Sequence, residues 1–503
     1  MKKIPIYFLA AAFCALSAGC YKDKGNYDYR DAESIPPVIL SELASSYDAV
    51  LLERLVIDPQ IKEDSDDYEY LWYMFVTNIS STANDTIGRA RKLDYLVTAQ
   101  TGTYRLVFKV TDKRNGTSAY QESIVVVSSN FSKGYYILKY ENGRTDVDFV
   151  DRAGTVNPGI LKQITGEDMP GTPVKQVYSS ARYCYGPDAS QRWQPAYIVC
   201  TDQDLRIFHG SDLSLIKTWE TAFREAPAVR KPQGLWATSG SGFMMMNDNS
   251  MHALASSTYS QGNFGAAFLT TGIKFSPYVA VAASGYQAFD ENAGTFLGFT
   301  GSTGNIISHD YAASTYPNVT GYDLVWMGAQ QAYNSTYAAY SYALVKSRAD
   351  GSHMLVETWA QYMQNFGFYF TNNFNVPADF GIIDGKVFAC MGGTGNTVIY
   401  YSTGDNVVHY YNPNNQSEKR SILSIPAGEE IVQLKHVYFD YPALGPPVDI
   451  FVVLAKVGNN WKVYAYEREG STPDILESSV VTYSGTGVPY HIMHRDPLFR
   501  MTY

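Results

Sequence analysis

Apolar and polar residues alternate along two segments in the first quarter of the chain, which is the pattern of half-buried β-strands. In residues 102–110 one face of the extended chain carries Tyr104, Leu106, Phe108 and Val110, and the other carries Arg105 and Lys109. A second segment alternates in the same way through Tyr68, Tyr70, Trp72 and Met74. A tryptophan strand facing such a partner fills the core of an immunoglobulin-type sandwich. We therefore predict one small β-sandwich over residues 35–129.

From residue 130 to residue 503 the chain repeats short strands about polar turns. In residues 196–208, for example, two apolar runs flank Asp202-Gln203-Asp204. Comparable units recur at 243–254, 288–308, 342–359, 385–401, 406–411 and 449–466. So many hairpins are more than one sandwich can bury, and they are typical of a β-propeller. We predict an all-β chain with a seven-bladed propeller over 130–503; six or eight blades, or a pair of further sandwiches, are the alternatives.

The first twenty residues have the organisation of an export signal. A cationic start at Lys2 and Lys3 precedes an apolar stretch over 4–16, which is shorter than the roughly 20 residues that span a bilayer. The stretch ends in Leu16-Ser17-Ala18-Gly19-Cys20, which resembles the bacterial lipobox. We predict a signal peptide over 1–19, lipidation of Cys20 and a flexible tether over 20–34. The alternative is an ordinary secretory signal with an incidental cysteine.

Charge and cysteine content narrow the classes of partner. The chain has 39 Lys and Arg against 49 Asp and Glu, and removal of Lys2 and Lys3 with the signal leaves 37 minus 49, or −12. An acidic chain without a basic run argues against nucleic acid as a partner.

With Cys14 removed and Cys20 lipidated, Cys184, Cys200 and Cys390 remain. A bridge between Cys184 and Cys200 is one possibility, and three buried free thiols are the slightly favoured one.

Three segments together resemble the PKD-like lipoproteins of Bacteroidetes. They are the start at 20–29, the Tyr70-x-Trp72 strand and the strand over 102–112, and the likeness continues through 133–138. The resemblance implies a lipid anchor in the outer membrane, facing the extracellular side. It also implies an accessory role beside SusC-like transporters and SusD-like binding lipoproteins, without catalysis or a cofactor.

Compact catalytic signatures are absent from the sequence. It contains no His-Glu-x-x-His, Gly-x-Ser-x-Gly, Walker loop or Cys-x-x-Cys. His491 and His494 could share a helical turn as metal ligands, but ordinary packing histidines are the stronger interpretation. The acidic turn of Asp64, Asp66, Asp67 and Glu69 lacks EF-hand spacing and is read as solvated. Asp248 is read as part of a polar turn. No metal site and no catalytic residue is predicted.

Aromatic residues are dense in the middle of the propeller region, and most of them are expected to pack in strands. The remainder lie among Gly, Asn, Ser and Thr, where exposed rings can bind sugar or peptide. As ligand-binding candidates we select Tyr322, Trp326, Tyr333 and Tyr337.

Three functions remain open at this point. The favoured one is a non-catalytic surface lipoprotein that binds a glycan or peptide, or docks onto a SusC/SusD-like uptake complex. The second is a secreted hydrolase of glycans or peptides with a propeller active site, which needs converging carboxylates or histidines. The third is a purely structural subunit of an assembly.

Overall fold

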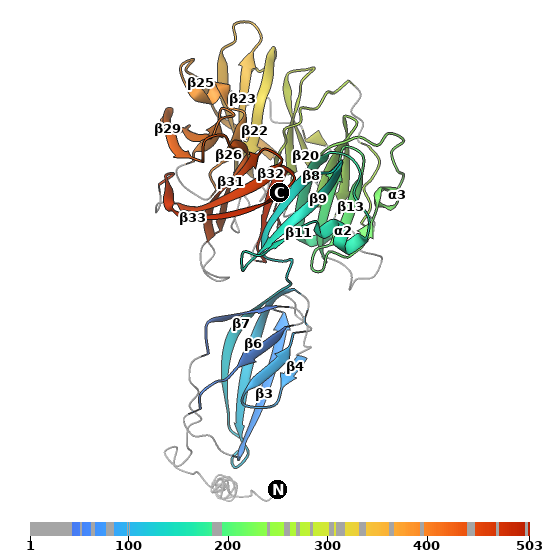
Figure 1. The fold of residues 1–503 in the computed structure, drawn as a ribbon, viewed down its shortest axis with the longest axis vertical. Helices are drawn as coiled ribbons and strands as arrows, with labels where there is room; N and C mark the ends of the chain where they lie inside the picture. The colour runs from blue at the N-terminus through green and yellow to red at the C-terminus, as the bar shows by residue number, and fades with distance from the viewer. Residues whose placement is uncertain are drawn as a thin grey trace, which may run out of the picture.

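The computed structural model shows two β domains, a small sandwich and a propeller, joined end to end (Figure 1). It describes residues 43–50, 53–61, 66–76, 85–97, 99, 101–183, 194–238, 242–255, 262–267, 272–281, 285–300, 306–307, 317–330, 339–361, 367–392, 397–439, 448–468, 472–497 and 501–502. The predicted signal peptide 1–19, Cys20 and the tether 20–34 lie outside these residues. Within them, no helix is both long and apolar enough to cross a membrane.

The sandwich packs a five-stranded sheet, in the order β1-β7-β6-β3-β4, against the pair β2-β5. Its strands are β1 (Ser46–Val50), β2 (Arg54–Ile57), β3 (Tyr68–Val76), β4 (Asp85–Gly88), β5 (Leu93–Leu96), β6 (Gly102–Asp112) and β7 (Ser118–Ser128). Trp72 is fully buried and stacks on Phe108, with ring centroids 4.2 Å apart. Its Nε1 donates a hydrogen bond to the Ala90 carbonyl at 2.9 Å. The predicted sandwich with a central tryptophan is therefore confirmed.

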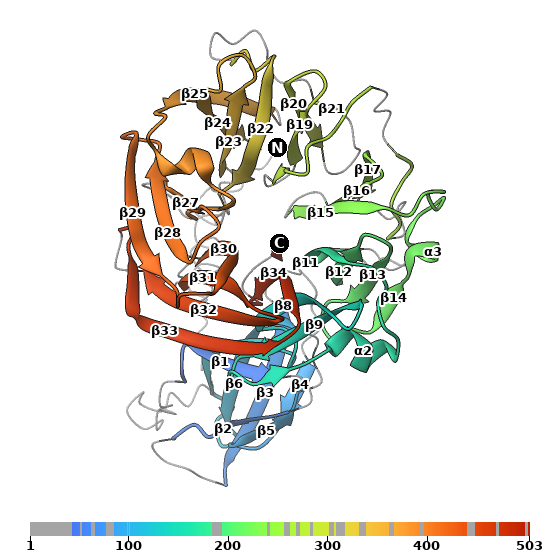
Figure 2. The ribbon, with the colours of Figure 1, turned by 45° about the horizontal axis from the view of Figure 1, so that its top comes forward.

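In the described part of the chain, seven further sheets follow one another around a ring, which confirms the predicted seven-bladed propeller (Figure 2). Blade 1 contains β8 (Gly134–Glu141), β9 (Arg144–Asp151), β10 (Val156–Asn157) and β34 (Val488–Arg495). Blade 2 contains β11 (Pro173–Tyr183), β12 (Gln194–Thr201), β13 (Leu205–His209), β14 (Leu215–Lys217) and β35 (Met501–Thr502). Blade 3 contains β15 (Pro232–Thr238), β16 (Gly242–Asn247) and β17 (Ser250–Ala255).

The remaining four blades are regular four-stranded sheets. Blade 4 contains β18 (Ala280–Val281), β19 (Gly285–Asp290), β20 (Thr295–Thr300) and β21 (Ile306–Ile307). Blade 5 contains β22 (Tyr322–Ala329), β23 (Ala339–Ser347), β24 (His353–Gln361) and β25 (Gly367–Val376). Blade 6 contains β26 (Val387–Cys390), β27 (Ile399–Ser402), β28 (Val407–Asn412) and β29 (Ser417–Ser424). Blade 7 contains β30 (Glu430–Phe439), β31 (Val448–Val457), β32 (Asn460–Arg468) and β33 (Ile475–Thr486).

The ring is closed by strands from both ends of the propeller region. β34, near the C-terminus, pairs antiparallel with β8, the first strand of the propeller, with Ile492 opposite Ile137. β34 is the inner strand of blade 1, and β35 then pairs with β11 of blade 2. This arrangement leaves neither end of the ring with an unpaired inner strand, which is how propellers protect their edges.

Apolar clusters between successive blades form the core of the ring. Blades 7 and 1, for example, share a cluster that contains Ile137, Val452, Trp461 and Ile492. Short helices α2 (Ile160–Thr165) and α3 (Trp219–Ala222) and the 3-10 turn η3 (Gly381–Asp384) lie in connections between strands. With both faces of each sheet covered by a neighbour, the inner strands are held as a rigid wall around the centre.

Candidate functional site

A cavity of about 280 Å³ lies at the centre of the propeller. The inner strands of blades 2, 3, 5, 6 and 7 line it, together with blade 4 and the segment that leads into it. The lining residues are Lys175, Trp236, Pro277, Tyr278, Val279, Val281, Trp326, Met327, Gly328, Ala329, Phe388, Ala389, Cys390, Gln433, Leu434, Lys435 and His436. Because six blades contribute, the cavity exists only in the closed ring.

Aromatic side chains form one part of the cavity wall. Trp326 of β22 is almost fully buried and stacks on Phe388 of β26, with centroids 4.8 Å apart and an interplanar angle of 18°. Tyr278, just before β18, is 37% exposed. The buried pair Trp326 and Phe388 holds this part of the wall in place, whereas the partly exposed ring of Tyr278 leaves one face open to a ligand.

Two lysines form a basic part of the wall. Lys175 lies on β11 and Lys435 on β30, and each keeps part of its surface open. Burial lowers the pKa of Lys175 to about 8. Burial, with the charge of Lys175 nearby, lowers the pKa of Lys435 to about 7. Both shifts mean that the free protein solvates these ammonium groups poorly.

His491 lies on β34, the strand between the two lysine-bearing blades. The residue is 5% exposed, and neither ring nitrogen has a hydrogen-bond partner among the described residues. Burial, followed by the charges of Lys175 and Lys435, holds the pKa of His491 well below its usual range. A buried polar ring without a partner is unusual in a stable core and marks a functional candidate.

His436, in contrast, is fully engaged by the fold. Its Nδ1 accepts a hydrogen bond from the Gly392 amide at 2.7 Å, and its Nε2 lies 2.8 Å from Asp449 Oδ1. Arg468 pairs with the same carboxylate through two 2.6 Å contacts. Burial opposes ionisation of Asp449, but the hydrogen bonds from His436 and Arg468 lower its pKa to about 2. This network joins blades 6 and 7 and supports the wall next to Lys435.

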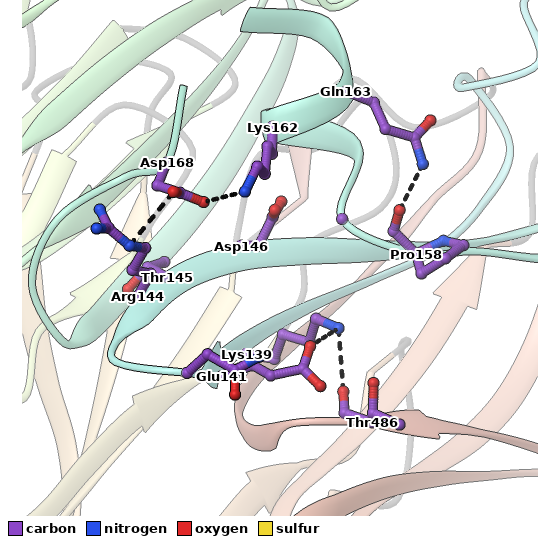
Figure 3. A pocket seen from close by; sticks show the side chains of 12 residues that line it. Lys139, Glu141, Arg144, Thr145, Asp146, Pro158, Lys162, Gln163, Asp168 and Thr486 are labelled. Atoms are coloured by element: carbon purple, nitrogen blue, oxygen red, sulfur yellow. Dashed lines mark hydrogen bonds and ion pairs between the residues drawn. The ribbon is translucent and has the colours of Figure 1, made fainter. Parts of the chain in front are cut away.

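A larger cavity of about 520 Å³ lies on blade 1 beside α2, and its charged groups neutralise one another (Figure 3). Lys139 Nζ lies 2.8 Å from Glu141 and 2.9 Å from Asp148. Arg144 and Lys162 both pair with Asp168, at 3.3 and 3.1 Å. Each of these cations therefore already has a carboxylate partner within the protein.

The predicted ligand-binding aromatics fall into three situations. Trp326 lines the central cavity. Tyr322, at the start of the same strand, packs against the cluster between blades 4 and 5 and is not among the lining residues. Tyr333 and Tyr337 lie outside the described residues. The sequence analysis did not select Lys175 and Lys435, because each reads there as an ordinary lysine that extends from an apolar strand toward solvent.

The remaining candidates take structural roles. His491 and His494 lie on strand β34, three residues apart, so the helical turn that would align them does not form. Cys200 is a buried free thiol, so the alternative of a bridge from Cys184 to Cys200 is not formed. Asp248 occupies the tight turn between β16 and β17. In the described part of the chain, no group of three or more His, Cys, Asp or Glu is placed to hold a metal ion.

Together, the sheets and the cavity define a class: a β-propeller protein with an N-terminal sandwich and a cavity at the centre of the ring. Residues 20–173 match the model of the PKD-like family. This segment contains the whole sandwich and the strands β8, β9 and β10 of blade 1. A search of curated proteins finds no match.

Solved structures give remote likenesses. A quinonprotein alcohol dehydrogenase-like protein from Bacteroides thetaiotaomicron is 12% identical, with 90% of this chain and 97% of that chain covered and a TM-score of 0.30. Apo AztD from Citrobacter koseri is 10% identical, with 84% and 97% covered and a TM-score of 0.37.

Proposed function

We propose that this protein is a non-catalytic binding lipoprotein on the outer face of the outer membrane, an accessory subunit of a SusC/SusD-like uptake system. The lipobox-like segment ending at Cys20 supports the anchor. The PKD-like match over residues 20–173 supports the family resemblance from which the accessory role is inferred. The ligand is a glycan or a peptide.

The central cavity is the observation that carries this proposal. Its lining combines the stacked aromatic pair Trp326 and Phe388 with basic and amide side chains, and polar groups are at least as prominent in it as apolar ones. Aromatic side chains beside polar groups that fix a ligand's orientation are found in small-molecule binding sites. None of the described lining residues is Asp or Glu, whereas glycoside hydrolysis commonly requires a pair of carboxylates. The geometry therefore favours binding over hydrolysis.

Two measurements test the proposal together. The first is affinity purification of the tagged, full-length protein from native outer membranes, with identification of the proteins that copurify. The second is titration of the mature protein with oligosaccharides and short peptides, with product analysis after long incubation. We expect SusC- and SusD-like partners, saturable binding and no products. Turnover of any substrate would establish the hydrolase instead, and copurification without any ligand would establish the structural subunit.

Replacing Tyr278 with alanine should weaken binding while leaving the fold intact, because its ring is a partly exposed part of the wall. Loss of an aromatic that anchors a ligand costs about 2 kcal/mol or more, or about thirtyfold in affinity. Tyr340→Ala is the matched control, since Tyr340 is 38% exposed and does not line the cavity. Equal affinities for the two variants would remove Tyr278 from the site.

A further inference from the structure

We propose that three aromatic side chains on blade 5, Tyr340, Trp359 and Tyr369, form a second binding site, and that this site takes a neutral glycan chain. We call these three side chains the aromatic row. The inference rests on the proposed binding function and adds to it a site outside the central cavity, with the class of its ligand. Blade 5 lies at the end of the molecule away from the sandwich, so a long polymer can reach it (Figure 1).

Strand pairing brings the three side chains together. Tyr340 on β23 lies directly opposite Trp359 on β24, and Trp359 lies directly opposite Tyr369 on β25. Residues that lie opposite each other on antiparallel strands present their side chains to the same face of the sheet. Because neighbouring strands are about 4.8 Å apart, the three rings follow one another across the blade at about that spacing.

The aromatic row lies on the face of blade 5 that is turned toward blade 6. The neighbouring residues Ser341 and Thr358 face the other way, since both form hydrogen bonds with Gln287 of blade 4. Further along the face toward blade 6, Tyr342 and Leu355 pack in the apolar cluster between the two blades. Among the described residues of that cluster, none belongs to the aromatic row. The row therefore lies beyond the packed part of this face.

The strands of blade 6 are too short to cover the whole of this face. β26 and β27 have four residues each, whereas β23 and β24 have nine and β25 has ten. Tyr340 and Tyr369 are each 38% exposed, and Trp359 is half-buried. Only five aromatic side chains of the described residues are more than a third exposed, and two of them stand in this row. Apolar surface gathered in this way marks a binding site.

Polar groups next to the aromatic row favour a neutral sugar as the ligand. Glu357 lies two residues before Trp359 on β24 and therefore on the same face. Its carboxylate accepts hydrogen bonds from the Tyr342 hydroxyl at 3.0 Å and from the Thr371 hydroxyl at 2.7 Å. A pyranose has C–H bonds on its faces for the aromatic rings and hydroxyls at its rim for these polar groups. The carboxylate repels acidic sugars and phosphate groups.

The direction of the aromatic row favours a glycan over a peptide. An extended peptide that binds a sheet runs along an edge strand and pairs with its main chain. The row instead crosses β23, β24 and β25 and offers one ring on each strand. A pyranose residue is about as long as the spacing between strands, about 4.8 Å. Successive sugar residues of one chain can therefore stack on successive rings of the row.

The experiment is native electrophoresis of the mature protein in gels that contain a soluble polymer. Xylan, galactomannan, laminarin and amylose are the neutral probes, polygalacturonate is the acidic probe, and gelatin is the peptide probe. The dependence of mobility on polymer concentration gives the dissociation constant. We expect at least one neutral polymer to retard the protein more strongly than polygalacturonate and gelatin do.

Tyr369→Ala and Trp359→Ala should each weaken binding of the retarding polymer at least about tenfold, as loss of an aromatic anchor does. Tyr369→Phe keeps the ring and should keep the affinity. Tyr490→Ala is the matched control, since Tyr490 is 40% exposed on β34 of blade 1. Thermal unfolding checks that the variants are folded. If Trp359→Ala does not fold, the exposed Tyr369 decides the case alone.

The aromatic row and the central cavity should lose binding independently. Tyr278→Ala, in the cavity wall, should keep the retardation by the polymer. Tyr340→Ala should lower that retardation and keep the affinity of the cavity for a disaccharide or a dipeptide, which are too short to span three rings. Loss of both kinds of binding in each variant would show that the two sites are not separate, and would overturn the inference.

Other outcomes also overturn the inference without touching the proposed function. If no neutral polymer retards the protein, or if the alanine variants at Tyr369 and Trp359 keep their affinity, the aromatic row is not a glycan site. Stronger retardation by polygalacturonate or gelatin would assign the row to another ligand. A wild-type dimer that Tyr369→Ala dissociates would make the row an interface between copies. In each case, binding in the central cavity is decided by its own titration.

Discussion

Tryptophan side chains connect packed sheets in both domains. Trp72 fills the sandwich and stacks on Phe108. Trp461, on β32 of blade 7, is fully buried and donates its Nε1 hydrogen to Asp148 of blade 1 at 2.8 Å. Asp148 also pairs with the buried Lys139 at 2.9 Å. A large apolar ring with one polar atom thus secures the contact between the first and last blades.

Trp72→Ala should unfold the sandwich while the propeller stays folded. Removing a large buried aromatic costs about 3 to 5 kcal/mol, a large part of the roughly 5 to 15 kcal/mol that stabilises a domain. Calorimetry of the full chain should show two transitions in the wild type and only the propeller transition in the variant. Tyr120→Ala is the control, since Tyr120 is 57% exposed on β7 and its loss should leave both transitions in place. An unchanged sandwich transition in Trp72→Ala would contradict the assigned core.

At the scale of elements, buried glutamines link neighbouring blades. Gln176 of blade 2 donates to the carbonyls of Tyr136 and His491 in blade 1, at 2.9 and 3.2 Å. Gln433 of blade 7 accepts a hydrogen bond from the Ile492 amide at 2.7 Å. Equivalent links run from Gln287 to blade 5 and from Gln330 to blade 6. An amide carries both a donor and an acceptor, so one side chain can satisfy backbone groups that the inner strands leave unpaired.

Gln176→Leu should destabilise the propeller although it adds apolar volume. The substitution removes the partners of two carbonyls and of the Tyr197 hydroxyl, which donates to Gln176 Oε1. Each buried polar group left without a partner costs about 1 to 3 kcal/mol. Gln203→Leu, at an exposed turn position of the same blade, is the matched control. Denaturant titration of the propeller transition checks the difference, and equal midpoints for the two variants would argue against the link.

The sequence predicts an element when the residue pattern that determines it lies within one short segment of the chain. Strand β6 could be predicted because its period-2 pattern alone separates the buried Leu106 and Phe108 from Arg105. The repeated hairpins likewise predict blades. The pairing of β34 with β8 could not be predicted, because the two strands lie at opposite ends of the propeller region. Nothing in the sequence of either strand indicates which strand it pairs with.

For the same reason, only part of the candidate site could be predicted from the sequence. Trp326 could be selected from sequence because aromatic density is a local property. Lys175 and Lys435 each read as an ordinary lysine that extends from an apolar strand toward solvent. Only the curvature of seven blades brings these two side chains to one cavity. Side chains from different blades that line one cavity can therefore be recognised in the structure, and not in the pattern of apolar and polar residues along the sequence.

At the scale of the whole molecule, the sandwich lies against one side of the propeller (Figure 1). Polar contacts across the junction include Thr101 Oγ1 with Ser211 Oγ at 2.6 Å and Arg152 with Asp48 at 2.5 Å. The ion pair is largely exposed, and exposed pairs contribute roughly 0 to 1 kcal/mol. This ion pair therefore contributes little to holding the two domains together.

Cys20→Ala should release the protein from the outer membrane or leave an uncleaved precursor, because a lipid on Cys20 is the proposed anchor. Cys14→Ala is the matched control, since Cys14 lies inside the predicted signal peptide and its loss should leave the anchor unchanged. Membrane fractionation and mass spectrometry of the mature N-terminus check both variants. A processed Cys20→Ala protein that still fractionates with the outer membrane would refute the anchor.

The closure of blade 1 by β34 also determines when the ring can form during export. In the proposed export, the chain leaves its channel with the N-terminus first, so β8 emerges well before its partner Val488–Arg495. Until then, the inner edge of β8 has open backbone groups and an apolar face, which is a hazard for aggregation. The half-made propeller therefore exposes an open strand edge until β34 pairs with β8, and a chain cut short before residue 488 should be cleared by proteases rather than accumulate.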